Sequence, residues 1–397
     1  MTMTFDDVVA PVGGARFVAE YLGQKPLHLE GSPDKFASVM RWEVLNRLLG
    51  MTTVWSQASL VLMLDKEPVP AGAYCAPAPG RDGGGVMRPD PLKVRAYLRQ
   101  GATLVANDID QLTPELSAFC RHLEKALGGK VQANLYLSSK RKQGFKVHYD
   151  THDVFAVHVE GEKVWHVFEG RADAPIAHPA FKSQPQEHHE AAKGELWREV
   201  RLTPGDLLYL PRGQYHYALA EEGGCVHVAF GVTYPIGLDA MAPLFDRAVA
   251  EPVFRRNLPR DDPAALKARL REMGERLAAA LAEDATAEAM RAFIDGFGYE
   301  RETYDLPDLL DSTRGRFEVR ASGVRLVESG GRVGLLKEGE RGAVEVPGGV
   351  KDMVAWVLGR KAFSRDQLDA AFGSRSQPER DKFLVDMQRM ALVRPAA

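Results

Sequence analysis

The sequence has few cysteines, no long apolar run and no excess of charge of either sign. Its 397 residues include three cysteines, at Cys75, Cys120 and Cys225, and no C-x-x-C pair. This argues against a disulfide framework or a thiolate zinc site and favours a cytoplasmic location. The 51 Lys and Arg residues are balanced by 54 Asp and Glu, so the chain lacks a general basic field for nucleic acid. No stretch approaches the roughly 18 apolar residues of a spanning helix, and we expect no membrane partner.

The composition is that of a globular protein with more than one domain. Hydrophobic residues make up 45% of the chain and charged residues 26%, which provides ample material for a core. Domains average roughly 100–200 residues, so two or three are expected. After about residue 238 the pattern becomes helical, with Asp262 as a predicted N-cap, Pro263 at the first helical position and an apolar stripe over 266–281.

The segment from residue 131 onward has the two-residue period of β-strands. The runs 131–139, 153–170 and 224–232 are rich in β-branched and aromatic residues, and Glu160–Gly161 between two such runs predicts a hairpin. Residues 171–195 have no steady period and are interpreted as an insertion loop. Several short strands at this spacing favour a sandwich or barrel, including the double-sheet jelly roll of cupins.

Nine of the eleven histidines lie between His148 and His227, and histidine is the commonest metal ligand. Two imidazoles and one carboxylate form the facial set that Fe(II) oxygenases use. On a strand, residues i and i+2 point to the same side, so His-x-Asp is an economical pair of ligands. Four His-x-Asp/Glu pairs occur: His28–Glu30, His122–Glu124, His148–Asp150 and His188–Glu190.

Only the His148–Asp150 pair adjoins the β-rich region. His122–Glu124 falls on a predicted helix, where the two side chains diverge, and is interpreted as surface. His216 directly follows a Pro–x–Gly turn and leads into a strand, which is a recurrent way to point an imidazole into a jelly roll. The three residues His148, Asp150 and His216 therefore form the predicted metal site, and we expect these ligands to be more exposed than core residues.

Two segments around the predicted metal ligands resemble a known protein family. GFKVHYDTHDVFAVHVEGEKVWHVF (144–168) and LTPGDLLYLPRGQYHYA (202–218) are similar to the JmjC-type ribosomal oxygenases, Fe(II)- and 2-oxoglutarate-dependent protein hydroxylases with bacterial arginyl and nucleolar histidyl members. Segments 17–31, 133–139 and 251–260 extend the resemblance. It covers roughly the whole chain, strongly over 130–260 and weakly after 300.

The resemblance assigns roles to individual residues. His148, Asp150 and His216 match the family's iron ligands, and Lys163 matches the basic residue that pairs with the C5 carboxylate of 2-oxoglutarate. A dianion inside an apolar barrel needs such a buried counter-charge. Asn134 matches a polar residue near the other end of the co-substrate. Tyr136, two residues further, faces the same side and either lines the pocket or belongs to the core.

The resemblance also implies an α+β architecture of three domains. A double-stranded β-helix catalytic domain (1–237) of the JmjC/cupin type is followed by a helical dimerisation domain (238–303) and a winged-helix-like domain (304–397). The expected substrate is a protein or peptide, a ribosomal protein by family default, modified on arginine or histidine. Lysine at position 163 resembles the histidyl members, whereas the bacterial arginyl enzymes carry arginine there.

Three functional hypotheses follow from the sequence. The first is a 2-oxoglutarate oxygenase acting on a protein side chain, with a non-ribosomal peptide or a small molecule as other substrate classes. The second is a metal cupin of another class, which would not need Lys163. The third is a ligand-sensing regulator with a DNA-reading wing. Residues 347–397 carry nine Lys and Arg against six Asp and Glu, too few for a DNA-reading helix, so we do not expect direct DNA binding.

Overall fold

The protein was analysed as a computed structural model, which divides into two compact units, Met1–Arg301 and Glu302–Ala397. The predicted boundary between 303 and 304 lies outside the described residues. The structure describes residues 3–79, 84–139, 144–221, 223–301, 315–329, 332–337, 343–346 and 348–395.

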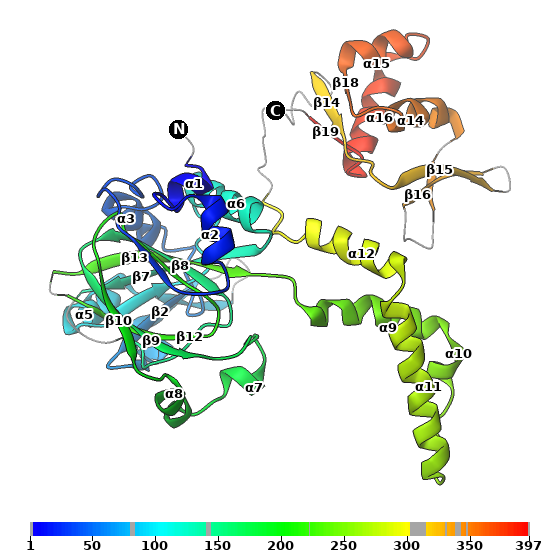
Figure 1. Ribbon diagram of the computed structural model, residues 1–397. Coiled ribbons are helices and arrows are strands. Elements are labelled where there is room, and N and C mark those ends of the chain that lie inside the picture. The colour runs from blue at the N-terminus through cyan, green and yellow to red at the C-terminus, as the bar shows by residue number, and fades with distance from the viewer. Residues whose placement is uncertain are drawn as a thin grey trace. The chain divides into compact units, whose positions relative to one another are not determined.

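Two antiparallel sheets form the centre of the first unit (Figure 1). The larger sheet has the strand order β1-β11-β8-β13-β7-β6-β2-β3, the smaller has β10-β9-β12, and β4 and β5 form a separate ribbon. The strands are β1 (Leu27–Leu29), β2 (Leu60–Leu64), β3 (Glu67–Pro68), β4 (Cys75–Pro79), β5 (Gly85–Pro89), β6 (Thr103–Ala106), β7 (Lys130–Ser138), β8 (Asp153–Glu160), β9 (Lys163–Arg171), β10 (Leu196–Leu202), β11 (Leu207–Leu210), β12 (Gln214–Ala220) and β13 (Cys225–Thr233).

Helices precede, interrupt and follow these strands. They are α1 (Phe5–Val8), α2 (Gly14–Glu20), α3 (Trp42–Gly50), α4 (Ala71–Tyr74), α5 (Pro91–Gln100), α6 (Pro114–Leu127), α7 (Pro179–Lys182), α8 (Gln186–Ala192), the 3-10 helix η1 (Gly237–Ala240), α9 (Met241–Ala250), α10 (Pro252–Arg255), α11 (Pro263–Leu281) and α12 (Asp284–Asp295). Within the described residues, no helix is long and apolar enough to cross a membrane.

Strand β8 is buried on both faces because layers cover both sides of the larger sheet. Val154 and Ala156 pack with β9 and β10 residues of the smaller sheet. Phe155, which points the opposite way, belongs to the core beneath the helices, where its ring centroid lies 5.6 Å from that of Phe17 in α2. The predicted two-sheet architecture is therefore confirmed.

The predicted hairpin at Glu160–Gly161 joins β8 to β9. Gly161 has φ +67°, and a Cβ there would lie 1.9 Å from the carbonyl oxygen of Gly224, so no other residue fits this turn without a shift of the backbone. The predicted insertion loop at 171–195 instead contains the short helices α7 and α8. With four and seven residues, these helices are too short for a helical period to emerge in the sequence.

Helix α11 begins as the sequence predicts. Asp262 is the N-cap, and its side chain accepts hydrogen bonds from the backbone N–H groups of Ala264 and Ala265, with Pro263 at N1. After α12, the buried guanidinium of Arg301 pairs with Asp110 and Glu124. The interpretation of the His122–Glu124 pair as surface is thus wrong for Glu124, because its side chain is only 9% exposed and is paired with Arg301.

The second unit has its own core. Its sheets are β18-β14-β19 and β15-β16-β17, and side chains from strands and helices fill the core. The elements are β14 (Arg316–Val319), β15 (Val324–Ser329), β16 (Arg332–Lys337), β17 (Val344–Val346), η2 (Gly348–Val350), α14 (Lys351–Leu358), β18 (Ala362–Ser364), α15 (Arg365–Ala371), α16 (Gln377–Arg389) and β19 (Val393–Pro395).

A buried polar cluster fixes β1 and β8 to the turn before β11. Asp206 accepts hydrogen bonds from the backbone N–H groups of Gly31 and Thr203, and its carboxylate lies 3.7 Å from Nε2 of His28. His158 is fully buried, and its ring Nε2 lies 2.9 Å from the carbonyl oxygen of Gly161. Burial lowers the pKa of His28 and lowers that of His158 from 6.5 to about 4.

These buried neutral histidines predict an acid-sensitive fold. Unfolding lets them take up protons below pH 6.5, so stability is full above that pH and is lost as the pH falls toward 4. The protonation of His158 on unfolding should by itself lower the free energy of unfolding by about 2 kcal/mol at pH 5. Urea unfolding at pH 7.5 and pH 5 measures this, and His158→Gln should flatten the difference. An equally steep loss in His158→Gln would contradict the assignment to His158.

Candidate metal centre

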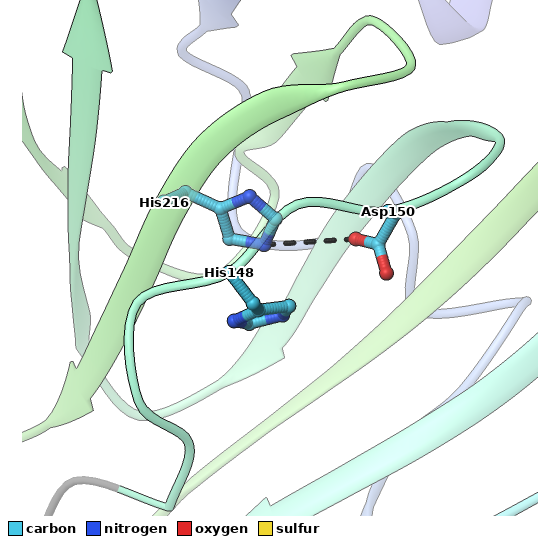
Figure 2. A group of neighbouring side chains, drawn as sticks. All are labelled: His148, Asp150 and His216. Atoms are coloured by element: carbon cyan, nitrogen blue, oxygen red, sulfur yellow. Dashed lines mark ion pairs between the residues drawn. The ribbon is translucent and has the colours of Figure 1, made fainter. Parts of the chain in front are cut away.

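Three side chains that are distant in sequence bring their metal-binding atoms together. One ligand atom each from His148, Asp150 and His216 lies within 4.8 Å of the other two, and Nε2 of His216 is 3.6 Å from Oδ2 of Asp150. Figure 2 shows the two imidazoles side by side, with the Asp150 carboxylate facing His216. Among the described residues, no other group of three potential ligands is this close.

Backbone pairing fixes the two histidines. His148 and His216 form an isolated antiparallel bridge, with N–H to O distances of 3.1 and 2.9 Å. Nδ1 of His148 lies 2.8 Å from the carbonyl oxygen of Lys146, and Nδ1 of His216 lies 3.0 Å from that of Gln214. Each Nδ1–H therefore donates to a backbone carbonyl, which leaves Nε2 free to bind a metal.

The expectation that His148 and Asp150 lie on a regular strand is wrong in detail. They precede β8, which begins at Asp153. The carboxylate of Asp153 accepts hydrogen bonds from the hydroxyl of Tyr209 and from the backbone N–H of Arg212. This side chain closes the turn, and the bridge to His216 supplies the alignment that a strand would otherwise give.

The protonation states suit metal binding. Burial and the nearby charge of His148 lower the pKa of His216 to about 4, so this imidazole is neutral at pH 7. Burial alone would raise the pKa of Asp150, but the imidazoles of His152, His148 and His216 lower it overall, so its carboxylate is ionised. The neutral imidazole of His216 and the anionic carboxylate of Asp150 belong to the donor set that fits Fe(II).

The three side chains border a cavity of about 150 Å³. The site residues predicted from the sequence all line it, and so do further residues that the sequence did not indicate. The polar and aromatic lining residues are Thr103, Asn134, Tyr136, Ser138, Phe145, His148, Asp150, His152, Lys163, Trp165, His216 and His227.

Lys163 is a buried cation in this cavity. Its exposed fraction is 6%, and its Nζ lies 5.9 and 5.8 Å from the ring centroids of Tyr136 and Trp165. Among the residues that the structure describes, no carboxylate pairs with it. Burial lowers the pKa of Lys163. An ammonium held without a partner in such surroundings is costly unless an anionic ligand joins it.

Asn134 and Tyr136 face the cavity from β7. Oδ1 of Asn134 accepts a hydrogen bond of 3.0 Å from the backbone N–H of Asp108. Its amide nitrogen donates to the hydroxyl of Tyr136 and has a second N–H for a ligand. The Tyr136 ring stacks on that of His227, with a centroid distance of 4.8 Å. Burial raises the pKa of Tyr136, so its hydroxyl stays protonated. The alternative left open for Tyr136 is resolved in favour of the pocket.

Some lining residues could have been found from the two-residue period. Ser138 continues the series Asn134, Tyr136, and Trp165 follows Lys163 on the same face of β9. His227 lies opposite Tyr136 in the register of β13 and β7, a position that the sequence of a single strand does not specify.

The family model described as the JmjC domain matches residues 109–239, a span that includes the three metal ligands and Lys163. This match, over about a third of the chain, confirms the resemblance to a JmjC domain that the motifs indicated. The matched span contains β7 to β13 and all of the residues that line the cavity except Thr103 of β6.

The relatives of this chain include ribosomal oxygenase 1 of Rattus norvegicus, which is 36% identical over 156 residues. These residues are 38% of this chain and 26% of the relative. The bifunctional lysine-specific demethylase and histidyl-hydroxylase NO66 of Drosophila persimilis is 24% identical over 266 residues, 65% of this chain and 36% of the relative. The chain thus spans about a quarter to a third of these relatives.

A solved structure shares the fold over most of the chain. The X-ray structure of E. coli ycfD aligns with 96% of this chain and 97% of its own, with 17% sequence identity and a TM-score of 0.50. At this identity the likeness concerns the fold alone. It agrees with the JmjC/cupin arrangement of a large antiparallel sheet with helices.

Proposed function

We propose that this chain is an Fe(II)- and 2-oxoglutarate-dependent oxygenase that hydroxylates a protein side chain. One observation carries the proposal: the His148–Asp150–His216 cluster and the unpartnered ammonium of Lys163 border the same cavity. The metal would take two imidazoles and a carboxylate, and Lys163 would pair with the distal carboxylate of the co-substrate. The names of the relatives support a ribosomal protein as substrate.

The residues of the chain hold the reactants and exclude water. With iron and 2-oxoglutarate bound, dioxygen yields succinate, CO₂ and a hydroxylated side chain, one oxygen atom going to succinate and one to the product. Asn134 donates its second amide N–H, and Tyr136 presents its hydroxyl to the co-substrate. Trp165 lines the cavity between Lys163 and His216. Its ring centroid lies 5.5 Å from that of His216.

Release of succinate separates this proposal from a metal cupin of another class. The purified chain is incubated with Fe(II), ascorbate and 2-oxoglutarate, with and without ribosomal proteins extracted from cells that lack its gene. We expect succinate in both reactions and more of it with the extract. Metal binding without any succinate would refute the proposal and favour the other class.

The helical segment supports a homodimer. Helix α11 packs with α9, α10 and α12, yet large apolar side chains remain open to solvent, with exposed fractions of 70% for Phe245, 52% for Met241 and 52% for Leu270. Soluble monomers rarely expose so large an apolar patch. A two-fold contact would bury it twice with one set of residues.

Light scattering at micromolar concentration tests the dimer. We expect the wild type to have twice the chain mass of 43.7 kDa, and Leu270→Glu with Leu277→Glu to have the mass of one chain. Arg271→Glu changes an exposed charge on the same helix and should leave the dimer intact. A wild-type mass near one chain would refute the dimer.

The remaining assignments complete the proposal. The helical segment (238–303) forms a dimerisation domain and 304–397 a winged-helix-like domain. In the latter, Arg365 and Arg380 pair with Asp369, and Arg375 pairs with Asp352, which supports a role other than direct DNA binding. The three cysteines are free and buried, which supports a cytoplasmic location.

A further inference from the structure

A glycine in the middle of β13 makes room for a histidine of the metal loop. Gly231 pairs with Gln132 on one side and Val154 on the other. A Cβ at this position would lie 2.1 Å from Cδ2 and 2.3 Å from Nε2 of His152. Glycine weakens a strand interior, and its presence there often marks a close approach. Here the approaching group is the imidazole of His152.

His152 belongs to the cavity but not to the metal ligands. It lies two residues after Asp150 and lines the same cavity, yet it is absent from the three-residue donor group. Across the part of the chain that the structure describes, neither nitrogen of His152 has a hydrogen-bond or ion-pair partner. Its imidazole therefore has donor and acceptor capacity available for a ligand.

The position of His152 favours the protein substrate over 2-oxoglutarate. Lys163, at the closed end of the cavity, is almost fully buried, whereas His152 is half-buried and the side chain of Asp150 is 31% exposed. The cavity therefore opens toward His152. A target side chain that approaches the metal from solvent passes this imidazole, while the co-substrate occupies the end beside Lys163.

We propose that His152 contacts the target side chain of the protein substrate and sets its selection, and that Gly231 is glycine because a larger residue would displace this imidazole. The inference rests on the proposed function. A neutral imidazole can accept a hydrogen bond from an N–H-bearing target, such as a guanidinium or another imidazole. If the side chain at position 152 served only to pack against Gly231, an aromatic ring without nitrogen atoms would be sufficient.

The test compares variants of His152 and Gly231 with the wild type on one probe, the extracted ribosomal proteins used above, with hydroxylated peptide measured by mass spectrometry. His152→Phe keeps a ring and removes both nitrogens, and we expect kcat/KM for the protein substrate to fall by about tenfold or more. The KM for 2-oxoglutarate should change far less. Gly231→Ala should cause a similar loss.

A double-mutant cycle separates this role from general damage to the fold. In a His152→Ala background, Gly231→Ala should cause little further loss, because the displaced side chain is already gone. Gly72→Ala is the matched control, since a Cβ there meets no atom within 4 Å. Melting temperatures of all variants identify any that unfold.

The outcomes separate two failures. Wild-type hydroxylation together with an unchanged kcat/KM in His152→Phe would overturn this inference and leave the proposed function standing. Fully additive losses from Gly231→Ala and His152→Ala would also overturn it. A wild type that forms no succinate from 2-oxoglutarate would overturn the proposed function, and this inference with it.

Discussion

Replacing His148 by alanine is expected to abolish iron binding and to lower 2-oxoglutarate turnover by roughly a thousandfold or more. The chain should stay folded, because His148 is only half-buried and its backbone bridge to His216 does not need the side chain. Iron content, succinate formation and the melting temperature measure the three effects. His188→Ala, at an exposed histidine of α8, is the matched control.

The outcome for His216→Ala should differ in one respect. The exposed fraction of His216 is 4%, so the expectation that the ligands are more exposed than the core is wrong for this residue. Its imidazole packs against Trp165, and an alanine would leave a gap. We therefore expect a lower melting temperature in addition to lost turnover. Full activity in either histidine variant would contradict the metal site.

Replacing Lys163 by methionine is expected to raise the KM for 2-oxoglutarate greatly. A carboxylate left in the cavity without its counter-charge costs roughly 2–5 kcal/mol, which corresponds to roughly 30-fold to several thousandfold. Iron binding should change little, because Lys163 is not among the three metal-binding residues. The KM comes from succinate formation, and iron affinity from titration of the oxygen-free protein.

The same variant should be more stable than the wild type without co-substrate. Methionine has a similar length and no charge, so it removes an unpartnered buried ammonium. Lys163→Ala should raise the KM equally but leave a gap. An unchanged KM would mean that another cation binds the carboxylate. Arg212, a basic residue in the turn before β12, does not line the cavity.

The sequence predicted the parts of the site that local patterns encode. His148 and Asp150 stand two residues apart, and His216 follows a Pro–x–Gly turn. Lys163 and Asn134 were instead assigned by resemblance to the family. The two-residue period then placed Tyr136 on the same face of the strand as Asn134.

Contacts between distant segments could not be predicted in this way. The stacking of Tyr136 on His227 depends on the register of β7 and β13, which the sequence of a single strand does not specify. The fit of His152 against Gly231 joins a turn to a strand 79 residues later. Likewise, the alternation of buried and exposed residues that is expected for a half-buried strand does not hold for β8, because other layers cover both of its faces.

The proposed chemistry is the insertion of oxygen from dioxygen into a protein side chain that enters this cavity. The most direct measurement incubates the chain, Fe(II) and 2-oxoglutarate with extracted ribosomal proteins under isotopically heavy dioxygen, followed by peptide mass spectrometry. We expect one heavy oxygen atom on a single side chain, at least an equal amount of succinate, and neither product with His148→Ala. Oxygen that derives from water, or a modified peptide without succinate, would contradict it.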